Sequence, residues 1–238
     1  MHRRARHLNP ASAGMGLVLD SRFITGLNAG DTVSNWKDRS SNANNATGAT
    51  NLPTYQTNRQ GGAPAVVFNS ATSTRLACST SVYTGANSRT LICVYKSTAT
   101  GSYVNGVGGQ SGTATTGAWF VMQSRTTTVT GDPYIAGFSA DTQDNKSTPD
   151  NQFKVGSGIY NGTTLLTRKN GVEIDSIARS MNTNNSVFRV GATDNGGTLG
   201  EFFLGDIAFI TAGQIPYSLS LVKRLEQSAA LSFKLPCS

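Results

Sequence analysis

The clearest pattern of apolar and polar positions lies near the end of the chain, between residues 186 and 213. Two apolar runs of the β type, residues 187–192 and 202–210, flank a turn-forming cluster at residues 193–197. Both alternating sets of positions are apolar in the second run, which is typical of a strand covered on both faces. The pattern predicts that the two runs form the central strand pair of a β-sandwich.

Shorter runs rich in β-branched and aromatic residues, separated by Gly, Asn and Ser, predict further strands along the chain. These strands are expected at residues 16–20, 33–36, 64–69, 76–79, 90–95, 118–123, 126–130, 153–160, 163–168 and 172–177. Asn170-Gly171 separates the last two and is typical of a two-residue hairpin turn. Residues 97–116 are rich in Gly, Ser and Thr and predict a loop or hairpin, and residues 139–151 predict an exposed loop.

The last segment has a different period. Residues 218–231 place Leu219, Val222 and Leu225 near the spacing of one helix face, shortly after Pro216. The predicted fold class is therefore all-β, a two-sheet antiparallel jelly-roll sandwich with one short C-terminal helix. A chain of 238 residues is normal for one such domain, and burial of roughly 70% of its unfolded surface gives it a sizeable core.

Charge divides the chain into two parts. Arg3, Arg4 and Arg6 supply three of the seven net positive charges, which leaves +4 for the rest of the chain. We therefore expect a basic N-terminal arm over residues 1–14 and one domain over residues 15–238. The arm is expected to bind other protein subunits, in a capsid or a homo-oligomer, and nucleic acid is not an expected partner because the domain carries no concentrated basic patch.

The cysteines and the hydropathy pattern indicate in which cellular compartment the protein is made. Cys78, Cys93 and Cys237 have no metal-binding spacing, and their odd number argues against a disulfide framework. No apolar run approaches the ~18 residues that a membrane helix needs, so no membrane partner is expected. The first residues lack the apolar stretch of a secretory signal, which predicts synthesis in a cytosol or an unusual route out of it.

The order of several short motifs resembles a known family. Trp36-Lys-Asp38-Arg-Ser40 precedes an Asn-rich turn, Pro53-Thr-Tyr55 and the strand GAPAVVFN at residues 62–69. Asp38 is expected to cap that turn through its own side chain. An N-G hairpin, a V-G strand, the strand GDIA and a terminal helix follow in order. This order resembles the laminin-G-like branch of the concanavalin A-like jelly rolls, the lectin and glucanase superfamily, over nearly the whole chain beyond the arm. The resemblance is to the non-catalytic branch of this superfamily.

Catalytic residues are not expected. The only histidines, His2 and His7, lie in the arm, so the domain has neither a Ser-His-Asp triad nor a His-based zinc site. Glycanases that resemble this fold carry a Glu-x-Asp-x-x-Glu strand, whereas Glu173, Glu201 and Glu226 are far apart in this sequence. The prediction is that the chain is not an enzyme.

Two kinds of ligand remain as candidates. Carboxylates on loops can hold Ca²⁺, and the candidates are Asp132, Asp141, Asp144 and Asp150, although their spacing matches no EF-hand and polar loops commonly carry such residues. No other cofactor is expected. Exposed aromatic rings can contact a glycan, and the candidates are Tyr103, Trp119 and Tyr134, with core packing as the alternative for Trp119.

These observations favour a structural or adhesive surface module. The first hypothesis is a virion protein, a bacteriophage capsid decoration or fibre, made in the host cytoplasm, anchored by its arm and contacting glycans at the virion surface. The alternative is a carbohydrate-binding, lectin-like module of a bacterial surface protein, on the cell or outside it. A glycan-active enzyme is the third hypothesis.

Overall fold

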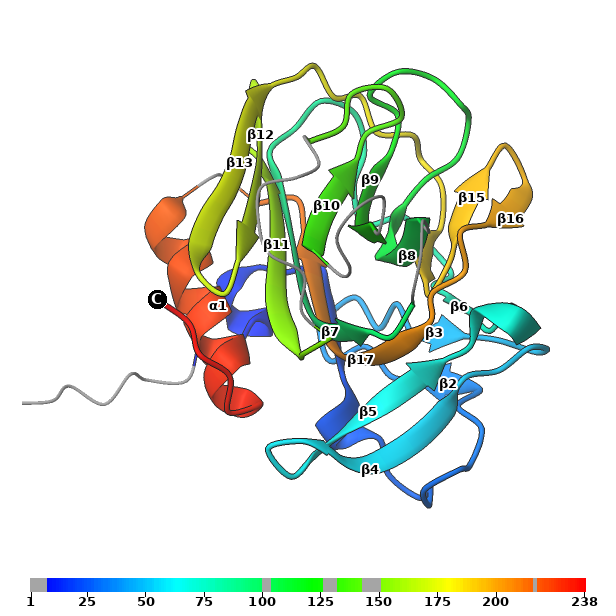
Figure 1. The fold of residues 1–238 in the computed structure, drawn as a ribbon. Coiled ribbons are helices and arrows are strands. Elements are labelled where there is room, and N and C mark those ends of the chain that lie inside the picture. Colours follow the sequence, from blue (N-terminus) through cyan, green and yellow to red (C-terminus); the bar gives the residue numbers. More distant parts are fainter. Residues whose placement is uncertain (1–7, 100–103, 126–131, 143–150, 216–217) are drawn as a thin grey trace, which may run out of the picture.

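The computed structural model describes residues 8–99, 104–125, 132–142, 151–215 and 218–238 (Figure 1). Two large antiparallel sheets stack on one another, and one helix, α1 (Leu219–Ser232), lies against the outer face of the first sheet. The predicted all-β jelly-roll sandwich with one C-terminal helix is confirmed.

The first sheet, called sheet A, has eight strands. Its order is β13 (Val172–Ala178), β12 (Thr164–Lys169), β11 (Lys154–Tyr160), β7 (Arg89–Ser97), β17 (Gly205–Gly213), β5 (Ala63–Phe68) and β4 (Thr54–Gln60), and β1 (Leu17–Asp20) also pairs with β17. Sheet B runs in the order β10 (Asp132–Ala136), β9 (Phe120–Arg125), β8 (Val104–Gln110), β14 (Phe188–Val190), β6 (Leu76–Ala77), β3 (Ala46–Thr47) and β2 (Asn35–Trp36). A separate hairpin joins β15 (Thr193–Asn195) to β16 (Thr198–Gly200), and three 3₁₀ turns are η1 (Ala11–Ala13), η2 (Ser21–Phe23) and η3 (Ser70–Thr72).

Strands β14 and β17 lie in opposite sheets, so the expectation that they pair with each other is wrong. β14 lies between β8 and β6 in sheet B, whereas β17 lies between β7 and β5 in sheet A. The turn cluster between them forms the β15–β16 hairpin, which projects from the sandwich (Figure 1). An apolar strand can bury its face from either sheet, so its pattern predicts burial but not its partner.

Burial on both faces is confirmed for β17, in which all nine residues are buried. Sheet A has this property because it separates two cores. On β7, Leu91 and Cys93 face the core between the sheets, while Ile92 and Val94 face the second core beneath α1. Strand alternation therefore makes sheet A the middle layer of three, with sheet B on one side and α1 on the other.

Strand β8 lies in a region for which the sequence predicts a loop or hairpin. Its Gly-rich sequence does not predict a strand, because glycine is depleted from most strands. Glycine is needed there: a Cβ atom on Gly109 would lie 2.4 Å from the carbonyl oxygen of Phe120 on the neighbouring strand. Strand β4 is a second strand that the sequence does not predict, and the strand expected at residues 126–130 lies outside the described residues.

The sequence correctly predicts the turn between β12 and β13, at the opposite end of sheet A from β4. Asn170 and Gly171 have φ angles of 50° and 85°, as the predicted tight turn between β12 and β13 requires. On β12, the Arg168 Nε atom donates to the Glu226 Oε1 atom of α1 at 2.8 Å, and both side chains are buried. This ion pair fixes the helix to the sheet.

Residues 8–14 pack against the same helix. Leu8 and Ala11 contact the second core, and the Ser228 hydroxyl of α1 donates to the Leu8 carbonyl oxygen at 2.9 Å. Arg3, Arg4 and Arg6 lie outside the described residues, so their predicted contact with other subunits stays a prediction. In the part of the chain that the structure describes, no helix is long and apolar enough to span a membrane.

Candidate functional site

Residues 35–39 join the two sheets and present two different faces. Trp36 and Asp38 are buried, while Asn35, Lys37 and Arg39 are exposed, as the period of an extended strand requires. Asn35 and Trp36 pair with β3 of sheet B, and a bridge between Leu19 and Asp38 links the segment to sheet A. The three outward side chains are therefore held on a strand that both sheets position.

The Asp38 carboxylate fixes this segment from the inside. Its Oδ1 atom accepts from the backbone N–H groups of Val18 and Ser40, each at 2.8 Å. Its Oδ2 atom accepts from the Ser40 hydroxyl at 2.6 Å and from the Asn44 N–H at 2.8 Å. The prediction that Asp38 caps the Asn-rich turn with its own side chain is confirmed.

An exposed aromatic ring lies beside the outward face of this segment. Asp20 ends β1 and caps η2 by accepting from the Arg22 N–H at 3.1 Å. Its two carboxylate oxygens also accept from the Arg22 guanidinium, at 3.0 and 2.6 Å. Phe23 follows with 48% of its surface exposed, and the Arg39 guanidinium carbon lies 3.6 Å from the centre of its ring.

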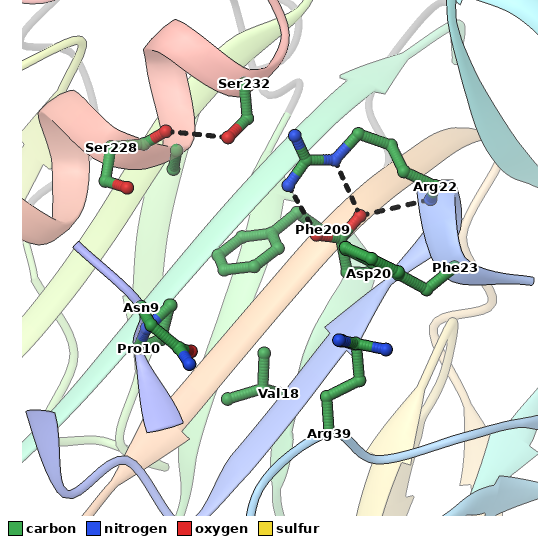
Figure 2. A pocket seen from close by; sticks show the side chains of 11 residues that line it. Asn9, Pro10, Val18, Asp20, Arg22, Phe23, Arg39, Phe209, Ser228 and Ser232 are labelled. Carbon is green, nitrogen blue, oxygen red and sulfur yellow. Dashed lines mark hydrogen bonds and ion pairs between the residues drawn. The ribbon is translucent and has the colours of Figure 1, made fainter. Parts of the chain in front are cut away.

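Phe23 and Arg39 border a pocket of about 180 Å³ between the N-terminal segment, β1 and α1 (Figure 2). We call it the helix-side pocket. Figure 2 shows Arg22 and Arg39 extending from the β1 side, with Ser228 and Ser232 on the helix across from them. The ring of Phe209 lies at its base, so an apolar floor is combined with polar walls.

A second pocket of about 210 Å³ lies on the other side of the same residues. We call it the edge pocket, because β2 is the edge strand of sheet B. Its rim carries the exposed hydroxyl and amide groups of Thr25, Ser34 and Asn35, together with Lys37. The two pockets share Asp20, Phe23 and Arg39, and we call the pair the Phe23 site.

The Phe23 site is positively charged. Asp20 is the only acid among the described residues that line it, and both of its oxygens bind Arg22. Lys37 and Arg39 make no ion pair with any residue that the structure describes. The site can therefore contact a ligand through the exposed part of an aromatic ring, form hydrogen bonds to hydroxyls and attract negative charge.

The aromatic residues proposed from the sequence lie elsewhere. Trp119 and Tyr134 are buried in a small cluster with Phe138, and the Trp119 Nε1 atom donates to the Gly112 carbonyl oxygen at 3.3 Å. Neither ring exposes a face to solvent, which argues against stacking on a sugar and favours the alternative of core packing. Tyr103 lies outside the described residues.

The proposed calcium ligands do not form a described cluster. Asp132 forms an ion pair with Lys169 at 2.8 Å, and the Asp141 Oδ1 atom accepts from the Gly137 N–H at 2.8 Å. Asp144 and Asp150 lie outside the described residues. Within the residues described, no group of three or more His, Cys, Asp or Glu side chains is placed to hold a metal ion.

No protein-family model matches the sequence, and no curated protein matches it either. Solved structures match in fold. An arabinofuranosidase complexed with arabinofuranosyl-α-1,2-xylobiose superposes with a TM-score of 0.65 at 14% identity, over 85% of this chain and 51% of that one. The present chain therefore spans about half the length of that enzyme.

Two further domains are also similar in fold. Domain 4 of AbnA, a GH43 extracellular arabinanase from Geobacillus stearothermophilus in complex with arabinotriose, has a TM-score of 0.55 at 14% identity over 84% of this chain and all of that domain. The binding domain of Paraclostridial Mosquitocidal Protein 1 has a TM-score of 0.61 at 13% identity over 92% of this chain and 53% of that one. At these identities the likeness shows the β-sandwich fold alone.

Proposed function

We propose that this chain is a carbohydrate-binding module without catalytic activity and that the Phe23 site holds the sugar. The observation that carries the proposal is the exposed Phe23 ring between two adjoining pockets with polar rims. Binding sites commonly combine an apolar surface with a few placed polar groups that fix the orientation of the ligand. A sugar ring offers both an apolar face and a fringe of hydroxyls.

The dimensions of the site suit a short stretch of a glycan. Pockets for drug-sized ligands measure roughly 300–1,000 Å³, whereas the two pockets here hold about 180 and 210 Å³. Each therefore suits a group of about one sugar ring, and the shared wall of Phe23 and Arg39 lets neighbouring rings occupy both. Domain 4 of AbnA, whose fold is similar, binds arabinotriose, which makes a short oligosaccharide a reasonable first probe.

The charges at the site support binding without hydrolysis. Glycoside hydrolysis generally needs two carboxyl groups roughly 5–10 Å apart on either side of the scissile bond. Asp20 is the single carboxylate among the described lining residues, and its ion pair with Arg22 occupies both oxygens. We therefore expect no release of reducing ends when the protein is incubated with polysaccharides.

The proposal is tested by removing the Phe23 ring. Isothermal titration of the full chain against arabinotriose, xylan and a wider glycan panel should give at least one binder, and Phe23→Ala should weaken that binder about tenfold or more, a loss of ~1.4 kcal/mol. Val172→Ala is the matched control, because Val172 is also apolar and exposed but lies outside the site. The proposal is overturned if no glycan binds, or if both variants bind as the wild type does.

A role on a virion remains a separate prediction, as does the alternative location on a bacterial cell surface. Residues 8–14 contribute to the second core, so an informative deletion should stop at residue 7. Loss of particle attachment on removing residues 1–7, with glycan binding retained, would support the predicted role of Arg3, Arg4 and Arg6 in anchoring.

A further inference from the structure

Three cationic side chains border the Phe23 site, and only one of them is neutralised. The Arg22 guanidinium donates to both oxygens of Asp20. Lys37 and Arg39 are exposed, and within the described chain neither side chain has a carboxylate partner. The site therefore carries a surplus of two positive charges.

Arg39 is held in place without losing its charge. Its guanidinium lies over the Phe23 ring, and a cation–π contact of this kind orients the group while leaving it positive. Its side chain donates no hydrogen bond to any described residue, so its N–H donors are available to a ligand. Because Arg39 belongs to the wall between the two pockets, a ligand in either pocket can reach it.

Lys37 adds a second cation on the same side of the strand. It lies two residues from Arg39 along an extended segment, which corresponds to about 6.4–6.8 Å. Both side chains line the edge pocket, and Asp38 between them points inward to its own hydrogen-bond partners. The backbone thus directs two adjacent positive charges at one pocket that contains no unpaired acid among its described residues.

We propose that the Phe23 site recognises an acidic glycan, in which a uronic acid carboxylate binds Arg39 and Lys37 while the sugar ring contacts Phe23. This inference rests on the proposed function and names its ligand class. A carboxylate is planar and matches the fork of a guanidinium, and hydrogen bonds between such charged groups are roughly twice as strong as neutral ones. A neutral sugar would leave both cations without a partner.

The test compares two polymers with the same sugar backbone, one with free carboxylates and one with those carboxylates methylated. Affinity electrophoresis and calorimetry of the full chain should show binding to polygalacturonate about tenfold or more tighter than to its methyl ester, and this difference should shrink at high salt. Arg39→Ala should weaken binding to the acid form about tenfold and binding to the ester by a clearly smaller factor, so that the preference for the acid form falls. Lys223→Ala, at an exposed lysine of α1 outside the site, is the control and should change neither.

The outcomes distinguish failure of the acidic ligand from failure of the proposed carbohydrate binding. If acid and ester bind equally well and Arg39→Ala affects both alike, the acidic ligand is excluded while carbohydrate binding stands. If dextran sulfate binds as tightly as polygalacturonate and depends equally on Arg39, recognition of a carboxylate is excluded in favour of any anion. If neither polymer nor any neutral glycan binds, the proposed function itself fails.

Discussion

The charged groups of this protein form two contrasting sets. Glu226, Arg168 and Asp38 are buried, and described partners bind each of them. Lys37 and Arg39 are exposed and have no ion-pair partner among the described residues. Asp38 and Lys37 are neighbours in sequence, so the alternation of one strand gives one residue a role in stability and the next the role in binding that we propose.

The largest expected effect concerns the pair beneath α1. Glu226→Ala leaves the Arg168 guanidinium buried without its carboxylate, and loss of one partner of such a pair typically costs about 3–5 kcal/mol of unfolding free energy. Urea unfolding measures this cost. The double variant Arg168→Met/Glu226→Leu is the control, because replacing both partners by apolar groups is often nearly neutral. A loss below about 1 kcal/mol for Glu226→Ala would mean that the pair does not hold the helix.

A smaller loss of unfolding free energy is expected for Asp38→Ala. This change removes the acceptor for the N–H groups of Val18, Ser40 and Asn44, and we expect a loss of about 2–3 kcal/mol, since buried donors without partners are costly. Glycan binding should weaken with it, because the same turn positions Lys37 and Arg39. Asp38→Asn retains one accepting oxygen and should fall between Asp38→Ala and the wild type in urea unfolding. Equal stability of Asp38→Ala and wild type would contradict this account of the turn.

Buried thiols are a further set of groups whose burial affects stability, because they must stay neutral in the folded protein. Burial, assisted by the Asp38 charge, raises the pKa of Cys78 from 9.0 to about 12. The thiol ionises in the unfolded chain above pH 9 but not in the folded one, so stability is lost as pH rises from about 9 toward 12.

At pH 10 this loss amounts to about 1.4 kcal/mol for one such thiol. Urea unfolding between pH 8 and pH 10.5 should therefore show a smaller decline for Cys78→Ala than for the wild type. Parallel declines in the two proteins would show that the Cys78 thiol does not control alkaline stability.

The sequence predicts best those features that depend on neighbours along the chain. Burial of β17, the Asn170-Gly171 turn and the cap at Asp38 each follow from a local pattern, and the structure confirms all three. The pairing of β14 with β8 and β6 could not be predicted, because apolar strands fit equally well in either sheet.

The Phe23 site was missed for a related reason. It combines residues 9–39 with Phe209 and residues 228–232, and the exposure of a single Phe cannot be read from its neighbours in sequence. The alternation of Asn35, Lys37 and Arg39 with buried residues is the one local signal that pointed to an outward polar face. Trp119 and Tyr134 are aromatic and were therefore predicted to contact a glycan, but aromatic residues in strands usually pack in the core.

The smallest expected effect completes the contrast between the two sets of charges. Lys37→Ala should change the unfolding free energy by no more than about 0.5 kcal/mol, because an exposed side chain without an ion pair contributes little. Arg39→Ala should cost at most about 1 kcal/mol, the strength of an exposed cation–π contact. A double-mutant cycle with Phe23→Ala isolates that contact in urea unfolding. If Lys37→Ala proves as destabilising as Asp38→Ala, the outward face is part of the scaffold, and the division between stability and binding along this strand does not hold.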